Sequence, residues 1–231
     1  SYRLVGSEMC IRDSHPHIVP VYDQGTLTEE EAAGLCAAGD PYLVMPRVEG
    51  GPLSRHLDGL GWPTIRAVLL QLLDALAHAH ARGVIHRDIK PDNVLIDGNL
   101  PRVCLTDFGI AHALEGVSIQ SSAGTPMFMA PEQIRDELHR QGPWTDLYAL
   151  GCMAWLMVTG APPFHGDIEA MLDSHQHAPR PALVPRTAVP DGLEGWLNTL
   201  IDPAPQQRFR HATAAAAALR ALQADAPLTL P

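Results

Sequence analysis

Four polar residues near the middle of the sequence have side chains suited to phosphoryl transfer. Asn93 precedes and Asp107 follows two short apolar runs, VLI and RVCLT, and the turn residues between the runs predict a β-hairpin. Antiparallel pairing would place Asn93 and Asp107 side by side, and their side-chain oxygens are hard ligands of the kind that Mg²⁺ prefers. Asp88 and Lys90 lie on the segment that enters the same edge of the hairpin. Asp88 could accept the proton of an acceptor hydroxyl, and Lys90 would add positive charge where negative charge develops.

Periodic apolar residues predict the elements that must hold these side chains in place. Two short runs with β-branched and aromatic residues, HPHIVPVYDQG and PYLVMPRV, predict a pair of strands. Thr28 and Glu31 have the spacing of a capping box, which predicts a short helix between those strands. A longer amphipathic stretch predicts a helix from Trp62 to about His80, ended by Gly83. The fold class is therefore α+β, with three further helices predicted near Leu147–Thr159, Leu193–Ile201 and Thr213–Gln223.

Length, charge and apolar run length limit what kind of protein this is. The 231 residues suffice for one domain with a real core, while two full domains would be cramped. With 16 basic against 26 acidic residues the formal net charge is -10, which disfavours a nucleic-acid partner. The longest apolar run, Leu147 to Val158, is shorter than the roughly 20 residues that a membrane-spanning helix needs. Scattered cysteines without a CxxC pair, and no export signal, indicate a reducing compartment, so a cytoplasmic location is expected.

Three motifs occur in order along the chain: HRDIKPDN at His86–Asn93, DFG at Asp107–Gly109 and APE at Ala130–Glu132. Together they resemble the signatures of eukaryotic-type serine/threonine protein kinases. The segments around them are similar to bacterial members of that family, many of which carry a membrane anchor outside the domain. The resemblance implies a two-lobe fold with a largely helical lower lobe. It also implies ATP and Mg²⁺ as cofactors and a protein substrate with a serine or threonine hydroxyl.

The family's catalytic roles carry over to the matching positions of this sequence. The resemblance implies that Asp88 is the base that orients the acceptor hydroxyl and that Asn93 and Asp107 bind the metal. Lys90 would lie near the transferred phosphate. A lysine two places after Asp88, together with a GTP segment that contains Thr125, is similar to serine/threonine kinases rather than tyrosine kinases. Thr125 would hydrogen-bond Asp88 and Lys90 and complete the acceptor site.

The resemblance also implies a nucleotide site and a regulated loop. The adenine would lie against the end of the second predicted strand, where it would contact Met45, the Pro46 carbonyl and the Val48 amide and carbonyl. Leu95 would lie below the ring. Arg87, directly before Asp88, resembles the arginine of kinases that are switched by phosphorylation of the activation segment. The candidate phosphorylation sites are Ser118, Ser121 and Ser122.

Other matching positions are expected to be structural. Glu132 and Arg208 would form a buried ion pair that holds the activation segment to the lower lobe, and the bidentate fork of arginine suits this role. Asp146 would hold the backbone of the catalytic loop from a buried helix. His86 would pack beneath the same loop without taking part in catalysis.

Three features of the family are not matched: a GxGxxG loop, a lysine on the third strand and a glutamate on the following helix. Lys90 is the only lysine, so no other residue can supply the missing phosphate-binding ammonium. The resemblance therefore implies an N-terminally truncated domain. Residues 15–48 match the last two strands and hinge of the upper lobe, 49–224 the lower lobe, and 225–231 a tail toward a linker. Residues 1–14 resemble translated sequencing-adapter sequence and are expected to be non-native.

The sequence alone leaves alternatives to an active kinase. The chain as written is expected to show little or no turnover, because phosphoryl transfer depends on positioning and charge neutralisation that the unmatched segment supplies. A pseudokinase or non-catalytic interaction module is favoured by the missing lysine and disfavoured by the intact Asp88, Asn93 and Asp107. A phosphotransferase of the aminoglycoside type shares the lower-lobe chemistry, yet it would not be expected to show GTP and APE around a long activation segment.

Overall fold

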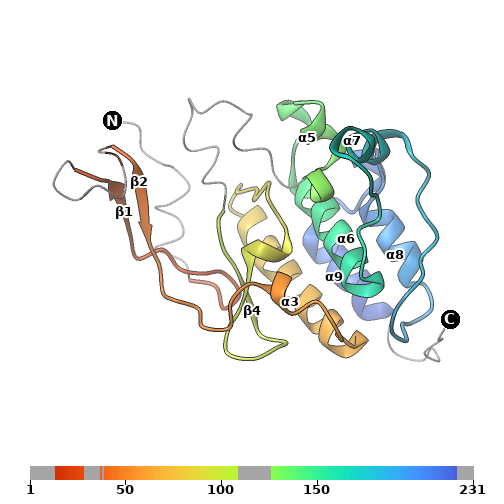
Figure 1. The fold of residues 1–231 in the computed structure, drawn as a ribbon, viewed down its shortest axis with the longest axis horizontal. Coiled ribbons are helices and arrows are strands. Elements are labelled where there is room, and N and C mark those ends of the chain that lie inside the picture. The colour runs from red at the N-terminus through yellow and green to blue at the C-terminus, as the bar shows by residue number, and fades with distance from the viewer. Residues whose placement is uncertain (1–13, 29–36, 38, 109–125, 223–231) are drawn as a thin grey trace.

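The computed structural model describes residues 14–28, 37, 39–108 and 126–222. Figure 1 shows a small two-stranded sheet at one end of the molecule and a helical body at the other. The sheet pairs β1 (Asp23–Thr26) with β2 (Pro41–Val44) in antiparallel register. The helices are α3 (Trp62–His80), α5 (Pro131–Ile134), α6 (Pro143–Thr159), α7 (Ile168–His177), α8 (Leu193–Leu200) and α9 (Ala212–Ala221). The predicted α+β class, with a reduced upper lobe and a helical lower lobe, is confirmed.

Helix α3 has the range that its apolar periodicity predicts. Pro63 lies in the first turn, where its missing N–H costs no hydrogen bond, and Gly83 follows the helix with a φ of 75°. The apolar face is fully buried, with exposed fractions of 1% or less at Ile65, Leu69, Leu72, Leu73 and Leu76. The helix packs against α6 and α9. It therefore gives a rigid start to the segment that follows it, residues 81–93, which we call the catalytic loop because it carries the predicted catalytic residues.

Helix α6 lies at the centre of the helical body. It is apolar on almost all faces, and residues such as Leu147 and Leu150 are completely buried. It packs against α3, α8 and α9. Gly151 permits the close approach of α8, because a Cβ atom at this position would lie 2.7 Å from the Cβ of Leu200. Gly160 ends the helix in the left-handed conformation that glycine adopts without strain.

The predicted hairpin is confirmed as β3 (Val94–Ile96) and β4 (Val103–Leu105). The two strands pair antiparallel, with Val94 opposite Leu105 and Leu95 opposite Cys104. Side chains alternate between the two faces of the hairpin. One face carries the buried Val94, Ile96, Val103 and Leu105, and the other carries the half-buried Leu95 and Cys104.

The first predicted strand is only partly correct. The structure places β1 at Asp23–Thr26, whereas the residues before it form a single bridge, between Ile18 and Leu105. Pro16 and Pro20 interrupt this part of the run and have no N–H to donate to a strand ladder. The segment before β1 is held instead by isolated hydrogen bonds to the β4 backbone.

Helices α5 and α7 are missing from the sequence prediction. Only His175 is buried among the residues of α7, so its sequence has no continuous apolar stripe. Asp167 caps the helix, because its carboxylate accepts the Ala170 N–H at 2.9 Å. The helix predicted from Thr28 and Glu31 falls outside the described residues. Within the described part of the chain, no helix combines the length and apolarity needed to cross a membrane.

The buried His175 makes stability depend on pH. Its Nδ1 atom lies 2.8 Å from the Tyr148 hydroxyl, and its ring contacts Phe164 with centroids 4.9 Å apart. Burial lowers the pKa of the imidazole from 6.5 to about 4, which the Pro126 carbonyl offsets only in part. The unfolded chain therefore takes up this proton at a higher pH than the folded chain. The stabilisation is complete above pH 6.5 and is lost progressively as the pH falls to about 4.

We expect the free energy of unfolding to fall on acidification, with this one group contributing at most about 1.4 kcal/mol per pH unit. Urea unfolding at several pH values across the window measures the slope. The His175→Gln variant keeps a polar partner for Tyr148 and should show a shallower slope than the unmodified chain. Equal slopes in the two proteins would contradict this assignment.

Candidate active site

The hairpin and the loop before it bring the predicted catalytic residues together. The loop ends in a short 3-10 helix, Pro91–Asn93, directly before β3. At the other strand, the Thr106 N–H donates to the Asn93 carbonyl at 3.0 Å. Asp107 is the next residue, so it leaves β4 beside the point where Asn93 enters β3. Its backbone adopts a φ of 63°, and the Thr106 hydroxyl lies 3.5 Å from its Oδ1.

Asp88 is held by two side chains that the sequence also singles out. Lys90 Nζ donates to Asp88 Oδ2 at 2.7 Å, and Asn93 Nδ2 donates to the same oxygen at 3.0 Å. Asn93 Nδ2 also donates to the Asp88 carbonyl at 2.8 Å. Both bonds use the amide nitrogen of Asn93, which leaves its Oδ1 as the atom that could bind a metal ion. An oxygen donor of this kind, with the Asp107 carboxylate nearby, suits Mg²⁺.

Asp146 fixes the backbone of the catalytic loop, as the sequence predicts. Its Oδ2 accepts the His86 N–H at 2.9 Å, and its Oδ1 accepts the Arg87 N–H at 2.7 Å. The Asp146 side chain is fully buried, so these bonds are shielded from water. His80 Nε2 also contacts Asp146 Oδ2, at 2.7 Å. Sequence reasoning missed this role of His80, because 66 residues separate the two partners.

His86 links the backbones on both sides of the site. Its Nε2 lies 2.8 Å from the Thr106 carbonyl, and its Nδ1 lies 3.2 Å from the Asp88 nitrogen. A carbonyl only accepts and an amide N–H only donates, so Nε2 carries the proton and Nδ1 accepts. Burial lowers the pKa of His86, although the Asp146 carboxylate opposes the shift. The imidazole is therefore a neutral structural bridge beneath the loop, as expected.

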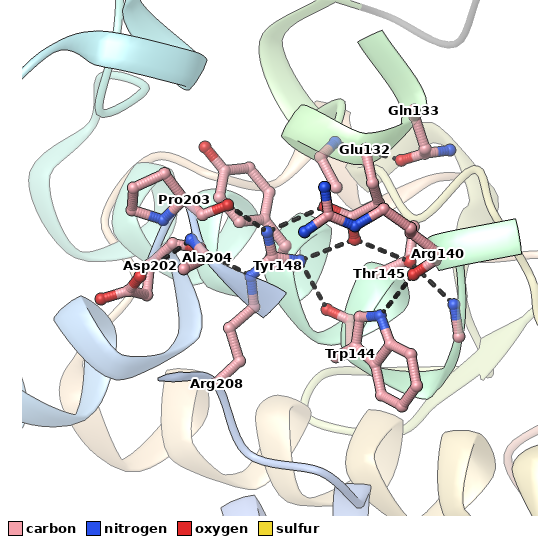
Figure 2. A network of polar contacts seen from close by, with 12 residues as sticks. Glu132, Gln133, Arg140, Trp144, Thr145, Tyr148, Asp202, Pro203, Ala204 and Arg208 are labelled. Carbon is pink, nitrogen blue, oxygen red and sulfur yellow. Dashed lines mark hydrogen bonds and ion pairs between the residues drawn. The ribbon is translucent and has the colours of Figure 1, made fainter. Parts of the chain in front are cut away.

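Glu132 and Arg208 form the predicted buried ion pair, and Figure 2 shows its network. Arg208 Nη1 donates to Glu132 Oε1 at 2.8 Å and Nη2 donates to Oε2 at 2.9 Å, a bidentate arrangement. The guanidinium also lies 4.6 Å from the centre of the Tyr148 ring and donates to the Asp202 carbonyl at 2.6 Å. The guanidinium and the carboxylate are thus almost completely buried, and both are fully hydrogen-bonded.

Three consecutive residues in the first turn of α6 hold different parts of the lower lobe. The Trp144 carbonyl accepts from Arg208 Nη1 at 3.1 Å. The Thr145 hydroxyl donates to Glu132 Oε1 at 2.8 Å. Asp146 holds the catalytic loop as described above. The ion pair and the catalytic loop are therefore attached to the same helical turn.

The structure brings only some of the residues predicted to contact adenine together. Met45 Sδ lies 3.8 Å from the Thr106 hydroxyl. Pro46 and Val48 line a cavity of about 460 Å³ that Cys104 also lines. Because Cys104 and Leu95 are cross-strand partners, they share one face of the hairpin. Neither Leu95 nor Met45 lines that cavity, so the structure does not bring the four predicted residues together around one cavity.

Four of the predicted functional residues fall outside the part of the chain that the structure describes. They are Thr125 and the candidate phosphorylation sites Ser118, Ser121 and Ser122. Arg87 is described: it has a left-handed backbone, with a φ of 68°. Its Nε is buried without a hydrogen-bond partner among the described residues.

Comparison with known proteins gives consistent matches. A family model described as protein kinase domain matches residues 7–218. The serine/threonine-protein kinase PknL of Mycobacterium tuberculosis is 37% identical over 224 residues, covering 91% of this chain and 52% of the relative. The serine/threonine-protein kinase Pkn1 of Myxococcus xanthus is 36% identical over 224 residues, covering 91% of this chain and 30% of the relative. A probable serine/threonine-protein kinase, PknB of Bifidobacterium longum, is 37% identical over 191 residues, covering 79% of this chain. The chain spans 27% to 52% of the length of these three curated relatives.

Proposed function

Because this chain belongs to the protein kinase family, as a bacterial-type serine/threonine kinase domain, we propose that the site around Asp88 transfers a phosphoryl group. The donor is Mg–ATP and the acceptor is a serine or threonine hydroxyl of a protein. The observation that carries the proposal is the Asp88 carboxylate bound by Lys90 and Asn93, beside the start of the Asp107 segment. ATP as the donor agrees with the cytoplasmic location expected from the sequence.

Each polar side chain has one task in this proposal. Asp88 orients the acceptor hydroxyl and takes its proton as the oxygen attacks the γ-phosphorus. A new bond forms between this oxygen and phosphorus, the bond to the β–γ bridging oxygen breaks, and ADP leaves. Lys90 neutralises negative charge on the transferred group. Asn93 Oδ1 and the Asp107 carboxylate hold Mg²⁺, which neutralises the charge of the phosphates when bound.

The nucleotide and the acceptor are held by residues on either side of these groups. We place the adenine against Met45, the Pro46 carbonyl and the Val48 backbone, with Leu95 below the ring. Pro46 lacks an N–H, but only its carbonyl is needed here. We assign Thr125 to the acceptor site, where its hydroxyl would bond Asp88 and Lys90. In this assignment residues 15–48 supply the hinge side of the nucleotide site and residues 49–224 supply the catalytic groups.

The chain by itself is expected to bind Mg–ATP weakly and to show little or no turnover. Lys90 is the only lysine in the 231 residues and already contacts Asp88, so no second ammonium is available to position the phosphates. Titration with a fluorescent ADP analogue, with and without Mg²⁺, measures binding. Incubation with labelled ATP and a serine- and threonine-rich acceptor protein measures transfer. Phosphorylation above background that Asp107→Ala abolishes would contradict the expected inactivity while supporting the site assignment.

A non-catalytic interaction module is the second candidate, and the single lysine is the observation that favours it. A scaffold has no need of metal ligands, so this candidate predicts no Mg²⁺-dependent nucleotide binding. Nucleotide binding that is the same with and without Mg²⁺, or absent altogether, would therefore favour the module over the phosphotransferase.

A further inference from the structure

The side chain of Gln133 joins helix α5 to the catalytic loop. We infer that Gln133 is a positioning residue for Asp88, which it serves through the Arg87 carbonyl; the inference rests on the proposed function of Asp88. Gln133 Nε2 donates to the Arg87 carbonyl at 2.8 Å, although 46 residues separate the two. Its Oε1 accepts the Ala130 N–H at 3.1 Å. The side-chain amide of Gln133 thus caps the N-terminus of α5 and also binds the backbone of the catalytic loop.

The peptide unit that carries this carbonyl is the one directly before Asp88. Its oxygen is held by Gln133, and its N–H, which belongs to Asp88, is held by His86 Nδ1 at 3.2 Å. The preceding N–H, of Arg87, is held by Asp146. Arg87 has a φ of 68°, a conformation that residues with a side chain rarely adopt. A strained residue of this kind persists only where its surroundings fix it, and Gln133 supplies the contact on the carbonyl side.

Gln133 reaches the loop from a helix that is itself anchored. The neighbouring residue, Glu132, is locked to Arg208 by the bidentate ion pair. Figure 2 shows that the two side chains leave the same short helix in different directions: Glu132 points toward Arg208, and Gln133 points away from it. Adjacent residues of α5 therefore connect the ion pair to the backbone of the catalytic loop. Displacement of α5 would release the peptide before Asp88 even if Asp88 kept its own side-chain contacts.

The test is hydrogen exchange of single amides in the full chain without nucleotide. The Gln133→Glu variant keeps an oxygen to accept the Ala130 N–H and replaces the donor to Arg87 with a carboxylate that repels the carbonyl. We expect exchange of the Asp88 amide to become roughly tenfold faster, while amides in the middle of α6 keep their rates. At about pH 4 a protonated carboxyl can donate again, so the difference from the unmodified chain should shrink. A residue that only stabilises α5 would give no such recovery.

Two further variants complete the test. Gln207→Glu makes the same change at an exposed glutamine and should leave the Asp88 amide unaffected. Gln133→Met removes both hydrogen bonds without adding charge and should accelerate exchange at Asp88 at every pH. Unchanged exchange at Asp88 in both Gln133 variants would overturn the inference, and so would equal acceleration of the α6 amides. Binding of Mg–ADP to the unmodified chain is measured separately: its absence counts against the proposed function, while the exchange result still decides the role of Gln133.

Discussion

Replacing Arg208 with alanine is expected to lower the free energy of unfolding by about 3–5 kcal/mol. The Glu132 carboxylate is 1% exposed and would remain in the interior without its cation. Its remaining donor, the Thr145 hydroxyl, cannot compensate a full charge. The loss also removes the donors to the Trp144 and Asp202 carbonyls and the contact with the Tyr148 ring. Urea or thermal unfolding of the variant beside the unmodified chain measures the effect.

A matched pair of controls separates burial from charge. Arg140 pairs with Glu137 at 3.0 Å on the exposed surface, so Arg140→Ala should cost no more than about 1 kcal/mol. The double variant Glu132→Gln, Arg208→Met leaves no buried charge and should be less destabilised than Arg208→Ala alone. If Arg208→Ala cost no more than Arg140→Ala, the ion pair would not be the anchor that its geometry indicates.

Replacing Asp107 with alanine is expected to remove the Mg²⁺-dependent part of nucleotide binding. Loss of a carboxylate ligand leaves Asn93 as the sole proposed protein ligand, and an amide oxygen cannot offset the charge of the metal and phosphates. We expect the affinity for Mg–ADP to fall by at least about 10- to 100-fold, which is the loss typical of removing a residue that only supports a metal ligand. Isothermal titration with Mg–ADP, repeated with the metal chelated, measures the change.

The matched control lies outside the proposed site. Asp173 is paired with His177 on the surface of α7, at 2.8 Å, and lies outside the hairpin and the loop before it. Asp173→Ala should leave Mg–ADP affinity unchanged. Equal affinities for the Asp107→Ala variant and the unmodified chain would remove Asp107 from the metal site and leave the proposed chemistry without its main ligand.

Local signals in the sequence predict much of the fold. The start and end of α3 are correct because proline in the first turn, a continuous apolar stripe and a following glycine all act within the segment itself. The hairpin is correct for the same reason. The strand predicted from HPHIVPVYDQG is wrong in its first part, because its prolines limit pairing and the chain is held by separate contacts to β4. Helix α7 has too little apolar surface to be predicted from periodicity.

The motifs predict which residues form the candidate site, but they do not predict all the residues that hold them in place. Asp88, Lys90 and Asn93 lie within one short loop, so their spacing nearly fixes their contacts. The roles of His80 and Gln133 depend on partners 66 and 46 residues away. No local pattern marks a histidine at the end of a helix as a partner of Asp146, or a glutamine after APE as a partner of the Arg87 carbonyl. The contacts of His80 and Gln133 can be identified only from the folded structure of the lower lobe.

The first turn of α6 makes the candidate site a single cooperative unit. Trp144, Thr145 and Asp146 attach the ion pair and the catalytic loop to one point, so opening of that turn releases both together. Such a local opening would detach the loop that carries Asp88 from the lower lobe while leaving the contacts of Asp88 with Lys90 and Asn93 within the loop. Its free-energy cost is no greater than that of global unfolding.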